Sequence, residues 1–255
     1  MMCVQTESAL AKSKKPASQK KSESISVWRI SYFPGQVSAA STVYLSKDAI
    51  KISTEGSYEI IAREPTWNAV VTNKKTKRSC ELPPQKWRKE GFFLDPPDPK
   101  EYMNPKQANT SEKINFRGLQ SRKRIWVTIE SDAFYRYRAD PQKCLIELIS
   151  TEGAIPCSLM QREIISSWYG IPNLEGVPLF WENRMKNSTS LRLKVANVDR
   201  VNVPSEMFLP MKGTQRELSM MQLVDNKYKT AVTDFMEFDN EQAERKTKSK
   251  KQTDK

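Results

Sequence analysis

Residues 42–87 of this 255-residue chain read TVYLSKDAIKISTEGSYEIIAREPTWNAVVTNKKTKRSCELPPQKW, and they decide the fold class. In segments 50–53 and 58–63, apolar residues mostly alternate with polar or charged ones. A period of two is typical of strands that bury one face. Glu55 and Gly56 stand between the two segments and predict a tight connection. The stretch therefore predicts a β-meander.

The same alternation recurs on both sides of the meander. Order is expected to begin at Ile25, and further strand patterns occupy residues 123–130, 143–150 and 191–203. Residues 171–181 are apolar but broken by Pro and Gly, which predicts a loop leading into an edge strand. Together these patterns favour a mainly β (α+β) protein built on a curved antiparallel sheet.

Two helices are expected as well. Ser158 and Gln161 have the spacing of a capping box, and Gly170 ends the apolar pattern that follows them. This helix is expected to lie across the sheet and to bury its apolar face there. Segment 214–236 repeats apolar residues every three or four positions after a second capping-box pattern. Such a helix either packs on its own domain or docks against a protein partner.

Composition divides the chain into one domain and its polar appendages. Residues 1–24 form a Lys- and Ser-rich leader and residues 241–255 a basic tail, and both are expected to be disordered. A single β-rich domain is expected between them, at residues 25–240. Inside it, residues 83–113 are rich in proline and predict a long surface loop, with a lid or docking segment as the alternative. No apolar run predicts a transmembrane helix, and the leader lacks the order of a signal peptide.

Several kinds of catalysis lack their usual residues. The chain has no histidine, and its eight glycines form no phosphate-binding loop pattern. The four cysteines, at positions 3, 80, 144 and 157, form no C-x-x-C pair. They are expected to be thiols, with a disulfide between Cys80 and Cys144 as the alternative. We therefore expect a non-enzymatic protein that uses neither a metal nor a cofactor.

The formal charge of +12 raises the hypothesis of nucleic-acid binding. Much of that charge lies in the two ends of the chain, so the body is only mildly basic. Basic residues are interleaved with aromatic ones in the region 122–138, as nucleic-acid surfaces require. Binding of nucleic acid or of an acidic protein partner is therefore the alternative function. The cations concerned are Arg122, Lys123, Arg124, Arg136 and Arg138.

The meander, the strand around Trp67 and the segment NKKTKRSCELPPQKW at 73–87 resemble the lipoprotein-carrier (LolA-like) superfamily. The resemblance extends over roughly residues 26–210. It implies an incomplete β-barrel whose concave face is plugged by helices and holds acyl chains. Segment 158–170 would be the plugging helix, and the location would be periplasmic or otherwise extracytoplasmic.

The leading hypothesis is a carrier that holds an apolar, lipid-like ligand on the concave face of the sheet. Indole rings fit this role because they line apolar cavities, although they pack cores as well. The candidate ligand-binding residues are Trp28, Ile30, Tyr44, Ile52, Ile60, Val70, Trp126, Val127, Ile164 and Trp168. Under the resemblance, the cavity wall also includes Val27, Leu148, Leu193 and Val195.

Overall fold

The computed structural model describes residues 23–34, 39–92, 108–130, 142–171, 175–186 and 188–223. Within these ranges the protein is mainly β, and its strands form one sheet. The first half of the sheet contains β1 (Ser24–Tyr32), β2 (Ser41–Leu45), β3 (Ala49–Thr54), β4 (Tyr58–Arg63), β5 (Ala69–Asn73) and β6 (Arg78–Leu82). The second half contains β7 (Thr110–Phe116), β8 (Leu119–Glu130), β9 (Gln142–Thr151), β10 (Pro178–Met185) and β11 (Ser188–Pro204). A short strand, β12 (Gln215–Glu217), follows them.

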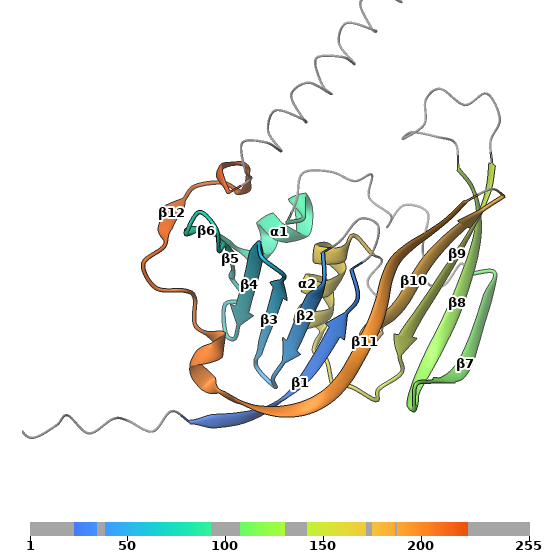
Figure 1. Cartoon of the computed structure of the whole chain (residues 1–255), viewed down its shortest axis with the longest axis horizontal. Helices are drawn as coiled ribbons and strands as arrows, with labels where there is room; N and C mark the ends of the chain where they lie inside the picture. Colours follow the sequence, from blue (N-terminus) through green and yellow to red (C-terminus); the bar gives the residue numbers. More distant parts are fainter. Residues whose placement is uncertain are drawn as a thin grey trace, which may run out of the picture.

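Two antiparallel meanders make up this sheet. The strand order is β12-β6-β5-β4-β3-β2-β1-β11-β10-β9-β8-β7, and β12 runs parallel to β6. The long strand β11 joins the halves, since its N-terminal part pairs with β10 and its C-terminal part with β1. The sheet stays open, with β12 and β7 as its edges (Figure 1). The predicted curved antiparallel sheet is therefore confirmed.

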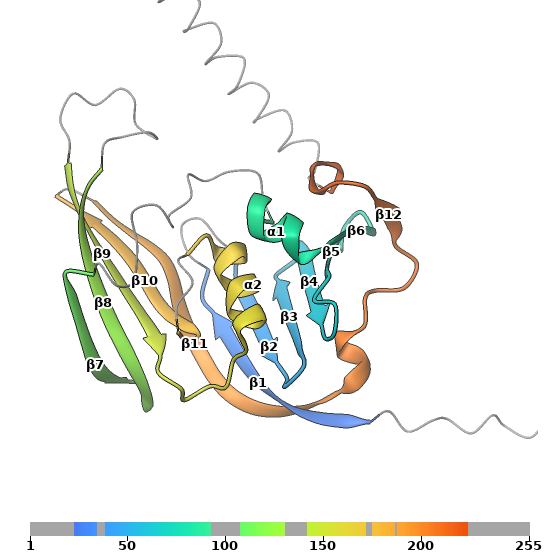
Figure 2. The same cartoon turned by 180° about the vertical axis from the view of Figure 1, so that it is seen from behind.

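Two helices, α1 (Pro84–Glu90) and α2 (Leu159–Tyr169), stand on the concave face, in front of the first half (Figure 2). The predicted capping box begins α2: Ser158 Oγ accepts from the Gln161 amide at 3.3 Å, and the Gln161 side chain accepts from the Ser158 amide. Gly170 ends the helix in the left-handed region, at φ 62°. The Gln161 side chain also donates to the carbonyls of Ser46 and Ala49, which fixes α2 on the sheet.

A row of aliphatic side chains lies under α2. Its members face one another across neighbouring strands and are almost fully buried. Cross-strand pairs of this kind stabilise a sheet through direct packing. The row consists of Ile30, Val43, Ile52, Ile60 and Val71.

The C-terminal part of the described chain passes over the convex face. After β11, the 3-10 helix η2 (Ser205–Phe208) contacts β3 and β4, and Phe208 is buried in a small cluster with Val27 and Ala49. The chain then adds β12 to the β6 edge, forms the 3-10 helix η3 (Met220–Gln222) and reaches Leu223.

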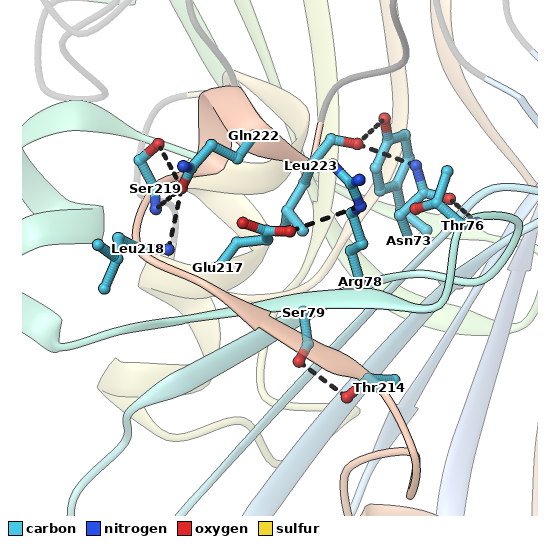
Figure 3. A network of polar contacts seen from close by, with 11 residues as sticks. Asn73, Thr76, Arg78, Ser79, Thr214, Glu217, Leu218, Ser219, Gln222 and Leu223 are labelled. Atoms are coloured by element: carbon cyan, nitrogen blue, oxygen red, sulfur yellow. Dashed lines mark hydrogen bonds and ion pairs between the residues drawn. The ribbon is translucent and has the colours of Figure 1, made fainter.

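Figure 3 shows how this segment is attached. Asn73 Nδ2 donates to the Leu223 carbonyl at 2.9 Å, and the Leu223 side chain is buried in the main core. The hydroxyls of Ser79 and Thr214 lie 2.8 Å apart. The C-terminal segment therefore ties the turn after β5 to the sheet edge.

The prediction of a helix at 214–236 is wrong for its described part. Residues 215–217 form β12, and the capping box present is that of Ser219 with Gln222, in a single 3-10 turn. Without β12, the outer edge of β6 would present unpaired backbone N–H and C=O groups. Residues 215–217 pair with these groups as a strand, which a helix could not do. Residues 224–236 lie outside the described ranges, as do residues 1–22 of the leader expected at 1–24 and the tail at 241–255. The last residue of that leader, Ser24, already belongs to β1.

Two further expectations need correction. The loop predicted at 83–113 contains α1, which begins at Pro84 because proline is tolerated in the first turn of a helix. It also contains the start of β7, whereas residues 93–107 lie outside the described ranges. The expected edge strand near residue 181 is β10, which lies between β9 and β11. Neither α1 nor α2 is long and apolar enough to cross a bilayer.

Candidate functional site

The candidate ligand-binding residues divide between the two faces of the sheet. Ile30, Ile52 and Ile60 belong to the aliphatic row on the concave face. Tyr44 pairs with Lys51, and Val70 pairs with Ile61, which places both on the convex face. The expectation that they share one wall is therefore wrong.

The same correction applies at two other places. Val27 adjoins Trp28, and Val127 adjoins Trp126, but successive residues of a strand point to opposite faces. Val27 lies in the convex cluster with Phe208, and Val127 is 37% exposed. Trp28, on the concave side, stacks under the guanidinium of Arg200 at 5.0 Å.

The helices fill the concave face of the first half with the protein's own side chains. Ile164 of α2 is fully buried, and Trp168 contacts Phe92 with their ring centroids 6.1 Å apart. Phe92 in turn stacks on Trp87 of α1 at 5.9 Å. A ligand would have to displace α2 to reach the aliphatic row.

The concave face of the second half has a different character. Arg124, Leu148, Trp181 and Leu193 face one another across β8, β9, β10 and β11. Trp126 lies two residues from Arg124 on the same face. Among the described helices, none stands in front of β8–β10 (Figure 2). We call the set of Arg124, Trp126, Leu148, Trp181 and Leu193 the tryptophan–arginine face.

The two indole rings of this face are buried but polar at one edge. Trp126 is 2% exposed and Trp181 is 8% exposed. The indole N–H of Trp181 donates to Asn183 Oδ1 at 2.8 Å. The guanidinium of Arg192 lies 6.0 Å from the Trp181 ring centroid. Apolar surface and positive charge thus occur side by side.

Arg124 is the most unusual residue of the face, because it is only 5% exposed and its charge is weakly compensated. One guanidinium nitrogen donates to Ser150 Oγ at 3.3 Å, and another lies 3.5 Å from a carboxylate oxygen of Glu175. The Glu175 side chain itself is 77% exposed, so water weakens its attraction. Burial lowers the pKa of Arg124, yet arginine keeps its charge in proteins. The one described ion-pair partner of this buried cation is therefore a largely exposed carboxylate, which leaves capacity for a second anion.

The described members of the cations proposed for nucleic-acid binding are divided between the two faces of β8. Arg122 is paired with Glu152, and this hydrogen bond lowers the pKa of Glu152. Lys123 points to the other face, where it lies near Glu112 and Glu147. Arg136 and Arg138 lie outside the described ranges. Within the described chain, Arg122 and Lys123 are thus paired with acidic neighbours, which weakens the case for a basic patch.

Sequence analysis missed two parts of the molecule that bear on binding. Trp181 was not a candidate, and it joins the tryptophan–arginine face through strand pairing, which the sequence does not display. Leu193 was expected in the cavity wall, but only under the resemblance. Ser31, Thr42 and Ser53 line a polar hollow at the ends of β1–β3. The alternation of these hydroxyls with apolar residues was visible, but strand register was needed to bring them together.

The cysteine and carboxylate side chains of the described residues are further candidates for a reactive or metal-binding site. The three described cysteines, Cys80, Cys144 and Cys157, are free thiols. Burial raises the pKa of Cys157 to about 12, so this thiol is a poor nucleophile. Within the described ranges, no group of three or more Cys, Asp or Glu side chains is arranged to hold a metal ion.

Comparison with known proteins gives little further guidance. No family model matches the chain, and no curated protein matches it. Among solved structures, an uncharacterized conserved protein from Thermus thermophilus is similar with a TM-score of 0.40 and 11% identity. The match covers 76% of this chain and 90% of that one.

Proposed function

We propose that this protein is a non-enzymatic binding protein for a lipid-like molecule with an anionic head group. The observation that carries the proposal is Arg124, a buried cation set among tryptophan and leucine side chains. Burying a charge is unfavourable unless it is well compensated, and the described counter-ion of Arg124, Glu175 at 3.5 Å, is largely exposed to water. Groups of this kind cluster at functional sites. A carboxylate or phosphate supplied by a ligand would compensate it.

The apolar residues of the tryptophan–arginine face suit the acyl chain of such a ligand. Trp126, Trp181 and Leu193 are large apolar side chains that an acyl chain would contact after displacing the groups that now bury them. Covering apolar surface contributes about 25 cal/mol per Å². The guanidinium would bind the head group through two parallel hydrogen bonds. The sequence predicted an apolar, lipid-like ligand on the concave face. The present proposal adds that its head group is anionic and that it binds to the second half of the sheet.

Fluorescence titration of the delipidated full-length protein with a dansyl-labelled fatty acid tests the proposal. We expect saturable binding that unlabelled fatty acid displaces and that the corresponding fatty alcohol displaces less well. Arg124→Met keeps an apolar side chain but removes the charge, and should weaken binding about tenfold, as loss of a charge-assisted hydrogen bond does.

Lys123→Met is the matched control. It removes a cation one residue away, on the opposite face, and should leave affinity unchanged. Circular dichroism confirms that both variants fold. Absence of saturable binding to the wild-type protein, or equal losses in both variants, would contradict the proposal.

A further inference from the structure

A polar hollow of about 330 Å³ opens at the ends of β1, β2 and β3. It shares no lining residue with the tryptophan–arginine face. Its walls are dominated by hydroxyl groups, with one ammonium and one carboxylate. The lining residues are Ser31, Tyr32, Ala40, Ser41, Thr42, Ser53, Thr54, Glu55 and Lys74.

Three of the hydroxyls form a row across the strands. Ser31 pairs with Thr42, and Thr42 pairs with Ser53, so the three side chains share one face at the usual strand spacing of about 4.8 Å. Among the described residues, the hydroxyls of Ser31 and Thr42 have no hydrogen-bond partner. A hydroxyl can both donate and accept a hydrogen bond. The hydroxyls of Ser31 and Thr42 can therefore donate hydrogen bonds to a bound molecule and accept them from it.

The ammonium of Lys74 is held beside this row. Its Nζ donates to Ser53 Oγ at 3.1 Å and to the Thr54 carbonyl at 2.8 Å. An ammonium has three donors, and the third has no acceptor within the described chain. Glu55 lines the same hollow, but these two described side chains form no ion pair with each other. A cation donor and a carboxylate acceptor are thus both available to a ligand.

The turn that carries Lys74 is held in place by hydrogen bonds of the Asn73 side chain. Asn73 Oδ1 accepts from the backbone amides of Lys75 and Thr76, at 3.0 and 3.2 Å. Asn73 Nδ2 donates to the Leu223 carbonyl, so the C-terminal segment holds the turn from the other side (Figure 3). Lys74 therefore reaches the hollow from a fixed backbone.

We propose that this hollow binds a small neutral polyol of monosaccharide size. Its two charges cancel, and its other polar groups are hydroxyls, so a ligand with several hydroxyls can accept from Lys74 and donate to Glu55. An inorganic phosphate would meet the negative charge of Glu55 and only one cation. The volume is at the lower end of that of small-molecule sites, which excludes an oligosaccharide enclosed as a whole.

Saturation-transfer NMR with the full-length protein tests this inference, using glucose, galactose and myo-inositol as probes and inorganic phosphate as the comparison. Binding of at least one polyol is expected. Lys74→Met should weaken it about tenfold, because a charge-assisted hydrogen bond is lost. Thr42→Val, which replaces a hydroxyl with a methyl group, should weaken it less.

Lys75→Met is the matched control, since Lys75 is exposed in the same turn and does not line the hollow. Loss of polyol binding in Lys74→Met but not in Lys75→Met supports the site. Binding of phosphate alone, no polyol binding, or the same loss in both folded variants overturns it. Fatty-acid binding is measured in parallel, so failure here is distinguishable from failure of the proposed function.

Discussion

The two halves of the sheet use their concave faces differently. In the first half, an aliphatic row is covered by α2, and the interior is closed by packing alone. In the second half, the equivalent face carries two indoles and a buried guanidinium. Aliphatic burial stabilises a fold, whereas a buried charge destabilises it unless a partner is present. Both halves contribute to the main core, and the buried guanidinium of Arg124 is the feature of the second half on which the proposed ligand site rests.

The largest expected effect is a loss of stability from a substitution next to β10, the strand that carries Trp181. A Cβ added at Gly176, just before β10, would lie 1.8 Å from the Thr151 carbonyl oxygen. The Thr151 amide donates to the Val177 carbonyl, and the Val177 amide donates to Thr151 Oγ1, so neither chain can move freely. Gly176→Ala should lower the free energy of unfolding by about 4 kcal/mol or more, measured by urea denaturation.

Gly153→Ala provides the control for this substitution. Gly153 has a φ of 75° but no atom within 4 Å of an added Cβ, so only backbone strain of about 1 kcal/mol is expected. If both variants lose the same stability, the close approach at Gly176 does not hold β10 in place.

A smaller loss of stability is expected in the first half. Ile164→Ala removes a fully buried side chain of α2 and should cost about 3 kcal/mol through the cavity that it leaves. Its affinity for the dansyl fatty acid, measured where the variant is folded, should equal that of the wild type. A parallel loss of affinity would show that the ligand contacts the helix-covered half, and the assignment of the halves would fail.

Local sequence predicted local structure well in this protein. The capping box of Ser158 and Gln161 identified α2, because all its partners lie within one turn. Alternation also identified β3 and β4. Prolines obscured α1 and β10, since a proline at the start of an element resembles one that breaks it.

The candidate site was harder to predict because it depends on register between distant strands. Trp126 was recognised as a candidate, but Arg124 was assigned to nucleic-acid binding although it shares the face of Trp126. Tyr44 was placed with Ile52, yet the turn between β2 and β3 sets Val43 opposite Ile52 instead. Which face a residue occupies depends on turn geometry, and a shift of one residue reverses it.

The smallest expected effect tests the junction between the halves. Tyr32 of β1 donates its hydroxyl to the Pro178 carbonyl of β10 at 2.9 Å, and its ring packs edge-on against Tyr169. Burial raises the pKa of Tyr32 well above its usual value of 10.0, and raises that of Tyr169 as well. The folded state therefore holds these protons more tightly than the unfolded state. This contribution to stability is complete below pH 10 and is lost as the pH rises further.

The unfolding midpoint in urea should accordingly fall above pH 10, and absorbance at 295 nm should show tyrosines that ionise only on unfolding. Tyr32→Phe should cost about 1 kcal/mol at pH 7, since it leaves the Pro178 carbonyl without its donor, and should reduce the alkaline loss. Tyr44→Phe, on the convex face, is the control and should change neither. An unchanged alkaline loss in Tyr32→Phe would show that the phenol of Tyr32 is not its source.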